Sequence, residues 1–95
     1  MITRIVKMTF REEETENFTE IFKETSEFIR SSNGCLEVKL MRDISNANVF
    51  FTLSKWQSEE HLNIYRCSDL FMTTWARVKP LFSEKAQAWS VEEFF

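Results

Sequence analysis

Hydrophobic and polar positions along the first third of the chain follow two different periods. Residues 2–10 alternate, so that one side of the segment carries Ile2, Arg4, Val6, Met8 and Phe10. A period of two is the pattern of a β-strand. From residue 18 the apolar residues recur every three or four positions, which gives a helix one apolar face. The chain thus begins with a predicted strand over residues 2–10 and a helix whose face is formed by Phe18, Ile21, Phe22, Thr25, Phe28 and Ile29.

The only glycine of the chain marks the predicted end of this helix. Gly34 follows Ser31-Ser32-Asn33, and glycine readily adopts the left-handed conformation that closes a helix. Residues 35–42 alternate again, and so do residues 49–56, which are rich in β-branched and aromatic side chains. Turn-forming residues occupy positions 43–48. We therefore predict two strands that are antiparallel neighbours.

The last forty residues predict an interrupted helix and a final strand. Ser58 is a good N-cap for a short helix, and Cys67-Ser68-Asp69 interrupts it. A further helix then carries Phe71, Trp75, Val78 and Phe82 on one face, and Pro80 should kink or end it. Alternation returns over residues 86–95.

This order of elements predicts an α+β, ferredoxin-like fold formed by a single domain over residues 1–95. Strand, helix, strand, strand, interrupted helix and strand give a four-stranded antiparallel sheet with helices on one face. The strands nevertheless carry apolar residues on both sides, as in Val49-Phe50-Phe51. An uncovered second face would expose an apolar patch larger than monomers usually tolerate. We expect a homodimer in which the two sheet faces pack together.

The composition of the chain supports a homodimer and argues against nucleic acid and membranes as partners. The 95 residues are 43% hydrophobic and include ten Phe and three Trp, more large apolar surface than so short a chain readily buries. A net charge of −3 argues against nucleic acid as a partner. No apolar run approaches the roughly 20 residues that cross a bilayer, and the N-terminus has no signal-peptide pattern, so we expect no membrane partner and a cytoplasmic location. Cys35 and Cys67 fit no metal or disulfide pattern and are predicted to be free and buried.

Several short motifs resemble one protein family. They are Gly34-Cys35-Leu36, Met41-Arg42-Asp43, Val49-Phe50-Phe51, Trp56-Gln57-Ser58-Glu59-Glu60, Tyr65-Arg66, the segment from Thr74 to Phe82, and Ala88-Trp89-Ser90. Together the motifs are similar to the antibiotic biosynthesis monooxygenase (ABM) domain of the dimeric α+β barrel group. The resemblance implies a homodimer with a pocket between sheet and helices in each subunit. For characterised members it implies oxygenation of electron-rich aromatics without metal or flavin, while other members bind and open haem.

The resemblance also suggests site residues. Trp56 matches the tryptophan that lies at the pocket in cofactor-independent members. The asparagine that those members carry four residues earlier is Thr52 here, and the tyrosine six residues later is Leu62. The asparagine, tryptophan and histidine of haem-degrading relatives are absent.

The candidate site residues each have a structural alternative. His61 is the only side chain whose ordinary pKa lies near neutrality, so it is either a catalytic base or a solvated or capping residue. Trp56 is either a reactant that orients a ligand oxygen through its indole N–H or a plug at the corner between strand and helix. The remaining candidates are substrate-binding or core residues, namely Thr52, Tyr65, Phe71 and Trp75. Arg77 and Lys79 are either solvated or an anion site.

The function predicted from these features is oxygenation of a small hydroxylated aromatic substrate, such as a quinol or polyketide, without a cofactor. The alternative is a non-catalytic dimeric module that binds a hydrophobic ligand or haem.

Overall fold

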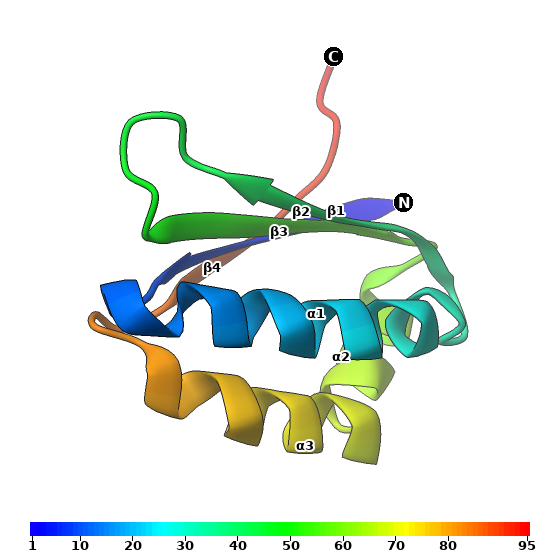
Figure 1. Cartoon of the computed structure of the whole chain (residues 1–95). Coiled ribbons are helices and arrows are strands. Elements are labelled where there is room, and N and C mark those ends of the chain that lie inside the picture. The colour runs from blue at the N-terminus through cyan, green and yellow to red at the C-terminus, as the bar shows by residue number, and fades with distance from the viewer.

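The computed structural model describes residues 1–95 and contains one antiparallel sheet with helices on one side (Figure 1). The strands are β1 (Ile2–Thr9), β2 (Cys35–Arg42), β3 (Val49–Trp56) and β4 (Gln87–Val91), and they lie in the order β2-β3-β1-β4. The helices are α1 (Thr15–Arg30), α2 (Glu59–Arg66) and α3 (Asp69–Val78), with 3-10 turns over Glu12–Glu14 and Lys79–Leu81. This arrangement confirms the α+β, ferredoxin-like fold.

The residues predicted to begin and end the helices do so. Ser58 Oγ accepts a hydrogen bond from the backbone N–H of His61 at the start of α2, and Ser68 Oγ accepts one from Phe71 at the start of α3. Gly34 has a φ of 83°, the left-handed conformation that lets the chain leave α1 and enter β2. Regular α-helix stops at Val78, two residues before Pro80.

Four sequence predictions need correction. β4 ends at Val91, which pairs with Thr3 near the start of β1, its only neighbour, so the last residues of the chain, 93–95, extend past the end of β1. Phe28 is 64% exposed, since it lies at the margin of the apolar face of α1. Phe82 follows the helix rather than continuing it and bridges to Phe10. Cys67 is exposed because it caps the C-terminus of α2, although both cysteines are free as expected.

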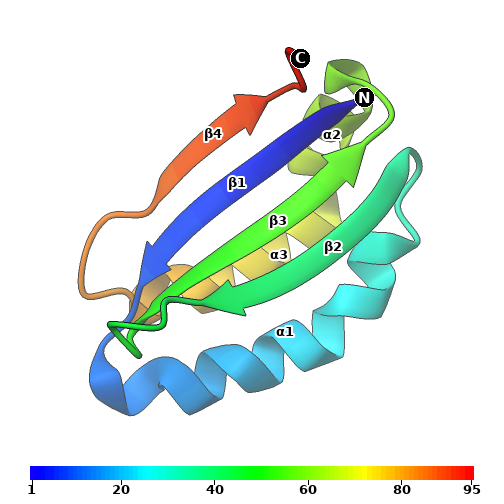
Figure 2. The ribbon, with the colours of Figure 1, turned by 90° about the horizontal axis from the view of Figure 1, so that it is seen from above.

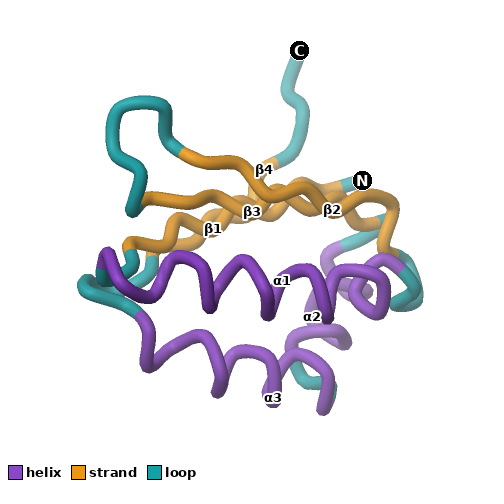
Figure 3. Tube along the Cα trace, in the orientation of Figure 1, coloured by secondary structure: helices purple, strands orange, loops and turns teal.

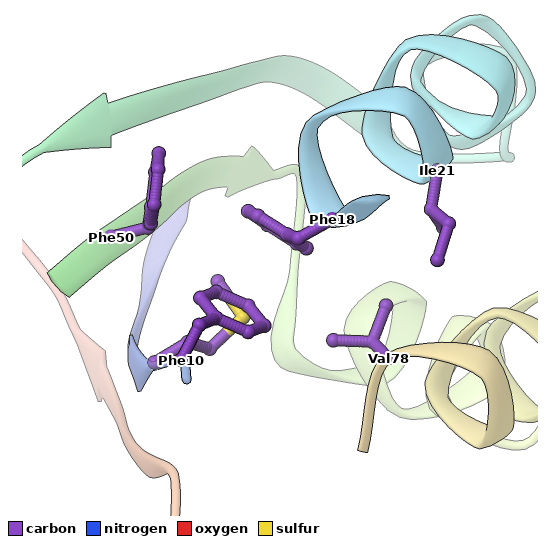
Figure 4. Close-up of a cluster of buried hydrophobic side chains, with 6 residues drawn as sticks. Phe10, Phe18, Ile21, Phe50 and Val78 are labelled. Atoms are coloured by element: carbon purple, nitrogen blue, oxygen red, sulfur yellow. The ribbon is translucent and has the colours of Figure 1, made fainter. Parts of the chain in front are cut away.

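The buried core lies between the helices and one end of the sheet (Figure 4). Phe10 and Phe18 stack with ring centroids 4.2 Å apart, and Phe50 meets both rings edge-on. Ile21 and Val78 extend the cluster toward the facing sides of α1 and α3. Phe10, Phe18 and Phe50 therefore fill the layer where β1 ends and β3 begins. The next inward residues, Val6 on β1 and Thr52 and Ser54 on β3, are smaller.

The opposite face of the sheet has no helix on it, as Figures 2 and 3 show. Trp89, Ile5 and Leu53 form one row across three strands of this outer face, and Phe51 pairs with Met41 in the next row. Trp89 is 45% exposed. The chain beyond β4 rises on this same side, away from the helices (Figure 1).

No helix of the structure is both long enough and apolar enough to span a bilayer.

Candidate functional site

A cavity of about 330 Å³ lies between the inner face of the sheet and the helices. Its lining comes from all four strands or their flanks and from all three helices, and 15 of its 21 residues are hydrophobic. The inward positions of β3 explain why space is left there. Phe50 fills the layer at one end of the strand, whereas Thr52 and Ser54 are too small to reach the helices. The cavity thus continues the core toward α2.

A row of aromatic rings forms the wall of the cavity on the side of α2 and α3. Trp56 and Tyr65 stack with centroids 4.8 Å apart, and Tyr65 meets Phe71 edge-on at 5.4 Å. Phe71 in turn lies parallel to Trp75 at 5.9 Å. Ring faces and edges of this kind suit a flat aromatic ligand.

Trp56 is fully buried, and its polar atom already has a partner. The indole N–H donates a hydrogen bond to Ser54 Oγ over 2.9 Å, and the residue is 0% exposed. Because an indole has a single donor, this bond leaves none for a ligand. The hydroxyl hydrogen of Ser54 remains free to donate into the cavity, so the serine presents the polar group that the sequence suggested for the tryptophan.

Tyr65 keeps its proton at neutral pH. Burial, and to a lesser extent the Cys35 thiol, raises the pKa of its phenol to about 12. A phenol that stays neutral is a hydrogen-bond donor rather than a base. Tyr65 can therefore stabilise negative charge on a ligand oxygen.

His61 lies outside the cavity lining. Its Nδ1 is 2.7 Å from Ser58 Oγ, and its ring packs directly over Gly34, where a Cβ atom would collide with it. The structure therefore brings together five of the predicted site residues, namely Thr52, Trp56, Tyr65, Phe71 and Trp75, and places the histidine at the corner joining α1, β2 and α2.

Arg4, Ser54 and Arg66 also line the cavity, although none of them was a candidate site residue in the sequence. Arg4 and Ser54 come from neighbouring strands, and Arg66 comes from the last turn of α2. Arg4 Nη1 donates to Ser90 Oγ over 2.9 Å. Burial, and then the positive charge of Arg66, lowers the pKa of the Arg4 guanidinium below its usual value. The sequence feature that could have identified Arg4 as a cavity residue is its position on the apolar side of an alternating strand.

The other cationic candidates do not reach the cavity. Arg77 pairs with Glu24 over 2.9 Å on the helical surface, and Lys79 is exposed. No three His, Cys, Asp or Glu side chains lie close enough together to hold a metal ion.

Comparisons with known proteins agree with this architecture. The model of the family described as antibiotic biosynthesis monooxygenase matches residues 1–77. No curated protein sequence matches the chain.

Solved structures show the same fold at low sequence identity. A conserved protein from Methanosarcina mazei has a TM-score of 0.92 at 18% identity, over 99% of this chain and 94% of its own. A candidate antibiotic biosynthesis monooxygenase from Nitrosomonas europaea has a TM-score of 0.91 at 14% identity, over 100% of both chains. A further structure described as an antibiotic biosynthesis monooxygenase has a TM-score of 0.92 at 16% identity, over 99% of each chain.

Proposed function

The chain belongs to the antibiotic biosynthesis monooxygenase family, and from this premise we propose that it oxygenates a small hydroxylated aromatic substrate without a cofactor. The observation that carries the proposal is the aromatic cavity between sheet and helices, which has hydroxyl donors beside its ring wall. At about 330 Å³ it is near the lower end of the roughly 300–1,000 Å³ of small-molecule sites. A substrate with one or two rings fits this volume best.

The proposed reaction uses the substrate itself as the electron source. A phenolate transfers an electron to O₂, and the resulting pair forms a carbon–oxygen bond at a ring C–H position. Loss of water from the hydroperoxide then gives a quinone carbonyl, so one oxygen atom enters the product and the other leaves as water. The substrate loses its phenolic hydrogen and one ring hydrogen, and these two hydrogens leave in the water molecule, so the step balances. The protein must bind the anionic substrate and keep water away from it.

The residues of the cavity support these two tasks. Tyr65 and Ser54 both line the cavity and carry hydroxyl donors, and a hydrogen bond from either one to a substrate oxygen favours its ionised form. Phe71 and Trp75 supply the apolar wall that excludes water. No Asp, Glu or His lines the cavity, so we propose that the phenolic proton leaves to solvent and that these donors lower its pKa. On this view His61 organises the start of α2.

Oxygen consumption tests the proposal directly. Hydroquinones and naphthohydroquinones should be screened, with the protein-free rate subtracted. We expect uptake of one O₂ per substrate molecule, and a loss of about tenfold in kcat for Tyr65→Phe, which corresponds to one hydrogen bond of about 1.4 kcal/mol. Phe71→Ala should also slow the reaction, whereas the matched control Phe28→Ala, on the exposed side of α1, should not.

His61→Ala decides the role of the histidine. A folded variant with an unchanged rate is expected, while a loss of about a hundredfold or more would identify a general base. The absence of uptake with every substrate would contradict the proposed activity.

The absence of a base in the cavity favours non-catalytic binding as a second candidate. An apolar cavity with a few polar groups is sufficient to hold a hydrophobic ligand. Haem fits less well, because no histidine or cysteine lines the cavity, and the remaining residues of haem-ligating types are Met8 and Tyr65, whose phenol keeps its proton. Saturable binding of an aromatic compound without oxygen uptake would support this candidate.

We also propose that the outer face of the sheet joins two copies of the chain. The row of Trp89, Ile5 and Leu53 gives that face a continuous apolar strip across the middle of the sheet. A second sheet packed at the usual spacing of about 10 Å would cover the strip, and a two-fold axis would let the same surface serve both subunits.

A further inference from the structure

The charged side chains of the cavity are all of one sign. Arg4 and Arg66 are the only ionisable acids or bases of the lining besides Tyr65, which is neutral. Neither arginine takes part in an ion pair. The other helical arginines differ in this respect, because Arg30 lies 3.5 Å from Glu27 and Arg77 lies 2.9 Å from Glu24. The cavity therefore contains two cations without a counterion.

Arg4 is held on the inner face of the sheet by its strand neighbours. It pairs in register with Ser54 of β3 and Ser90 of β4, and its Nη1 donates to Ser90 Oγ over 2.9 Å. A guanidinium has five N–H donors, so this single bond orients the group and leaves most of its donors available. A half-buried cation with only a neutral partner is unfavourable, and an anion would satisfy it.

Arg66 approaches the same end of the cavity from the helical layer. It lies in the last turn of α2, one residue beyond Tyr65, and its side chain is otherwise exposed. The positive charge of Arg66 is the second cause, after burial, of the lowered pKa of Arg4. Two like charges at one site repel each other, and a shared anion between them would remove the repulsion.

From this geometry we propose that Arg4 and Arg66 form an anion-binding end of the cavity, which takes the carboxylate of an aromatic carboxylic acid while the ring lies against Tyr65 and Trp75. This anion site rests on the proposed function only because both use the same cavity. It narrows the substrate class to hydroxylated aromatic carboxylates.

A carboxylate suits this end of the cavity for two reasons. Guanidinium groups bind carboxylates through paired, charge-assisted hydrogen bonds. The rest of the cavity is mostly apolar and small, so a planar group with one negative charge costs less to desolvate there than a phosphate with two.

Isothermal titration calorimetry with two probes of the same shape tests the proposal. The probes are 1-hydroxy-2-naphthoate and the neutral 1-hydroxy-2-naphthamide. We expect the wild-type protein to bind the carboxylate at least about tenfold more tightly, equivalent to about 1.4 kcal/mol. Arg4→Gln and Arg66→Gln should each weaken carboxylate binding and leave amide binding unchanged. Arg66→Gln is informative even if Arg4→Gln fails to fold, because the side chain of Arg66 is exposed.

Arg77→Gln is the matched control. It removes a helical arginine whose charge is already paired with Glu24, and both affinities should stay as in the wild type. Equal binding of the two probes, no binding of either probe, or equal losses for both probes in the Arg66 variant would overturn the proposal. Carboxylate-selective binding without any oxygen uptake would uphold the anion site and overturn the proposed oxygenation, so the two failures are distinguishable.

Discussion

Tyr65 is the residue whose environment leads to the most direct measurement. It is the only tyrosine of the chain, so phenolate absorbance near 295 nm reports on it alone. Burial raises its pKa to about 12, and we expect native protein to ionise near that value and urea-unfolded protein to ionise near the ordinary value of about 10. Spectrophotometric titration of both states measures the difference.

The same shift has a defined sign for stability. The folded state holds the Tyr65 proton more tightly than the unfolded state, so this contribution is fully present below pH 10 and is lost as pH rises from 10 toward 12. Tyr65→Phe should remove both the absorbance change and this part of the alkaline loss. Native ionisation near pH 10 would show that the ring is open to water.

Individual residues of the cavity and of its surroundings show which parts of the site can be predicted from the sequence and which cannot. Trp56, Thr52 and Phe71 were placed at the pocket by motif and by helical spacing, both of which are local. Arg4 was visible on an apolar strand side, but its role depends on Ser90, which is 86 positions away in sequence. His61 was selected for its chemistry alone, and its packing on Gly34 depends on how α2 meets the turn after α1.

At the scale of elements, the corner between α1, β2 and α2 depends on Gly34. Its positive φ disfavours any other residue, and an added Cβ would collide with the Cγ, Cδ2 and Cβ atoms of His61. We expect Gly34→Ala to lower the free energy of unfolding by about 3 kcal/mol, combining backbone strain with overpacking. Urea denaturation measures the loss.

A double variant separates the two causes. His61→Gly, rather than His61→Ala, removes all three of the atoms nearest to the added Cβ, because the Cβ of residue 61 is one of them. In that background Gly34→Ala should cost only about 1 kcal/mol for the left-handed backbone. An equal cost in both backgrounds would show that the histidine moves aside freely.

Element boundaries followed the sequence wherever local signals set them. β2 and β3 begin and end as predicted because turn residues and Ser58 delimit them. β4 is shorter than its alternating pattern because a strand needs a partner, and β1, its only neighbour, begins at Ile2. Alternation alone carries no information about the length of a neighbouring strand.

For the whole molecule, the outer sheet face predicts the state of assembly. Sedimentation equilibrium at micromolar concentration should give twice the 11.4 kDa of one chain. Ile5→Glu places a charge in the middle of the apolar row, between Leu53 and Trp89, and should give a folded monomer, because burying an unpaired carboxylate at the interface is costly. Met72→Glu, on the exposed side of α3, is the control and should leave the mass unchanged. A wild-type mass of 11.4 kDa would exclude the dimer.

The hydrogen bond between Trp56 and Ser54 has one more consequence. Because that indole proton is sealed from water, its exchange with deuterium must wait for the structure to open. The indole of Trp89 lies on the uncovered sheet face and exchanges without such an opening unless a second subunit covers it. The indole resonances of Trp56 and Trp89 in one NMR spectrum thus report on separate events. Exchange at Trp56 follows the opening of the region around the cavity, and exchange at Trp89 follows the separation of two chains.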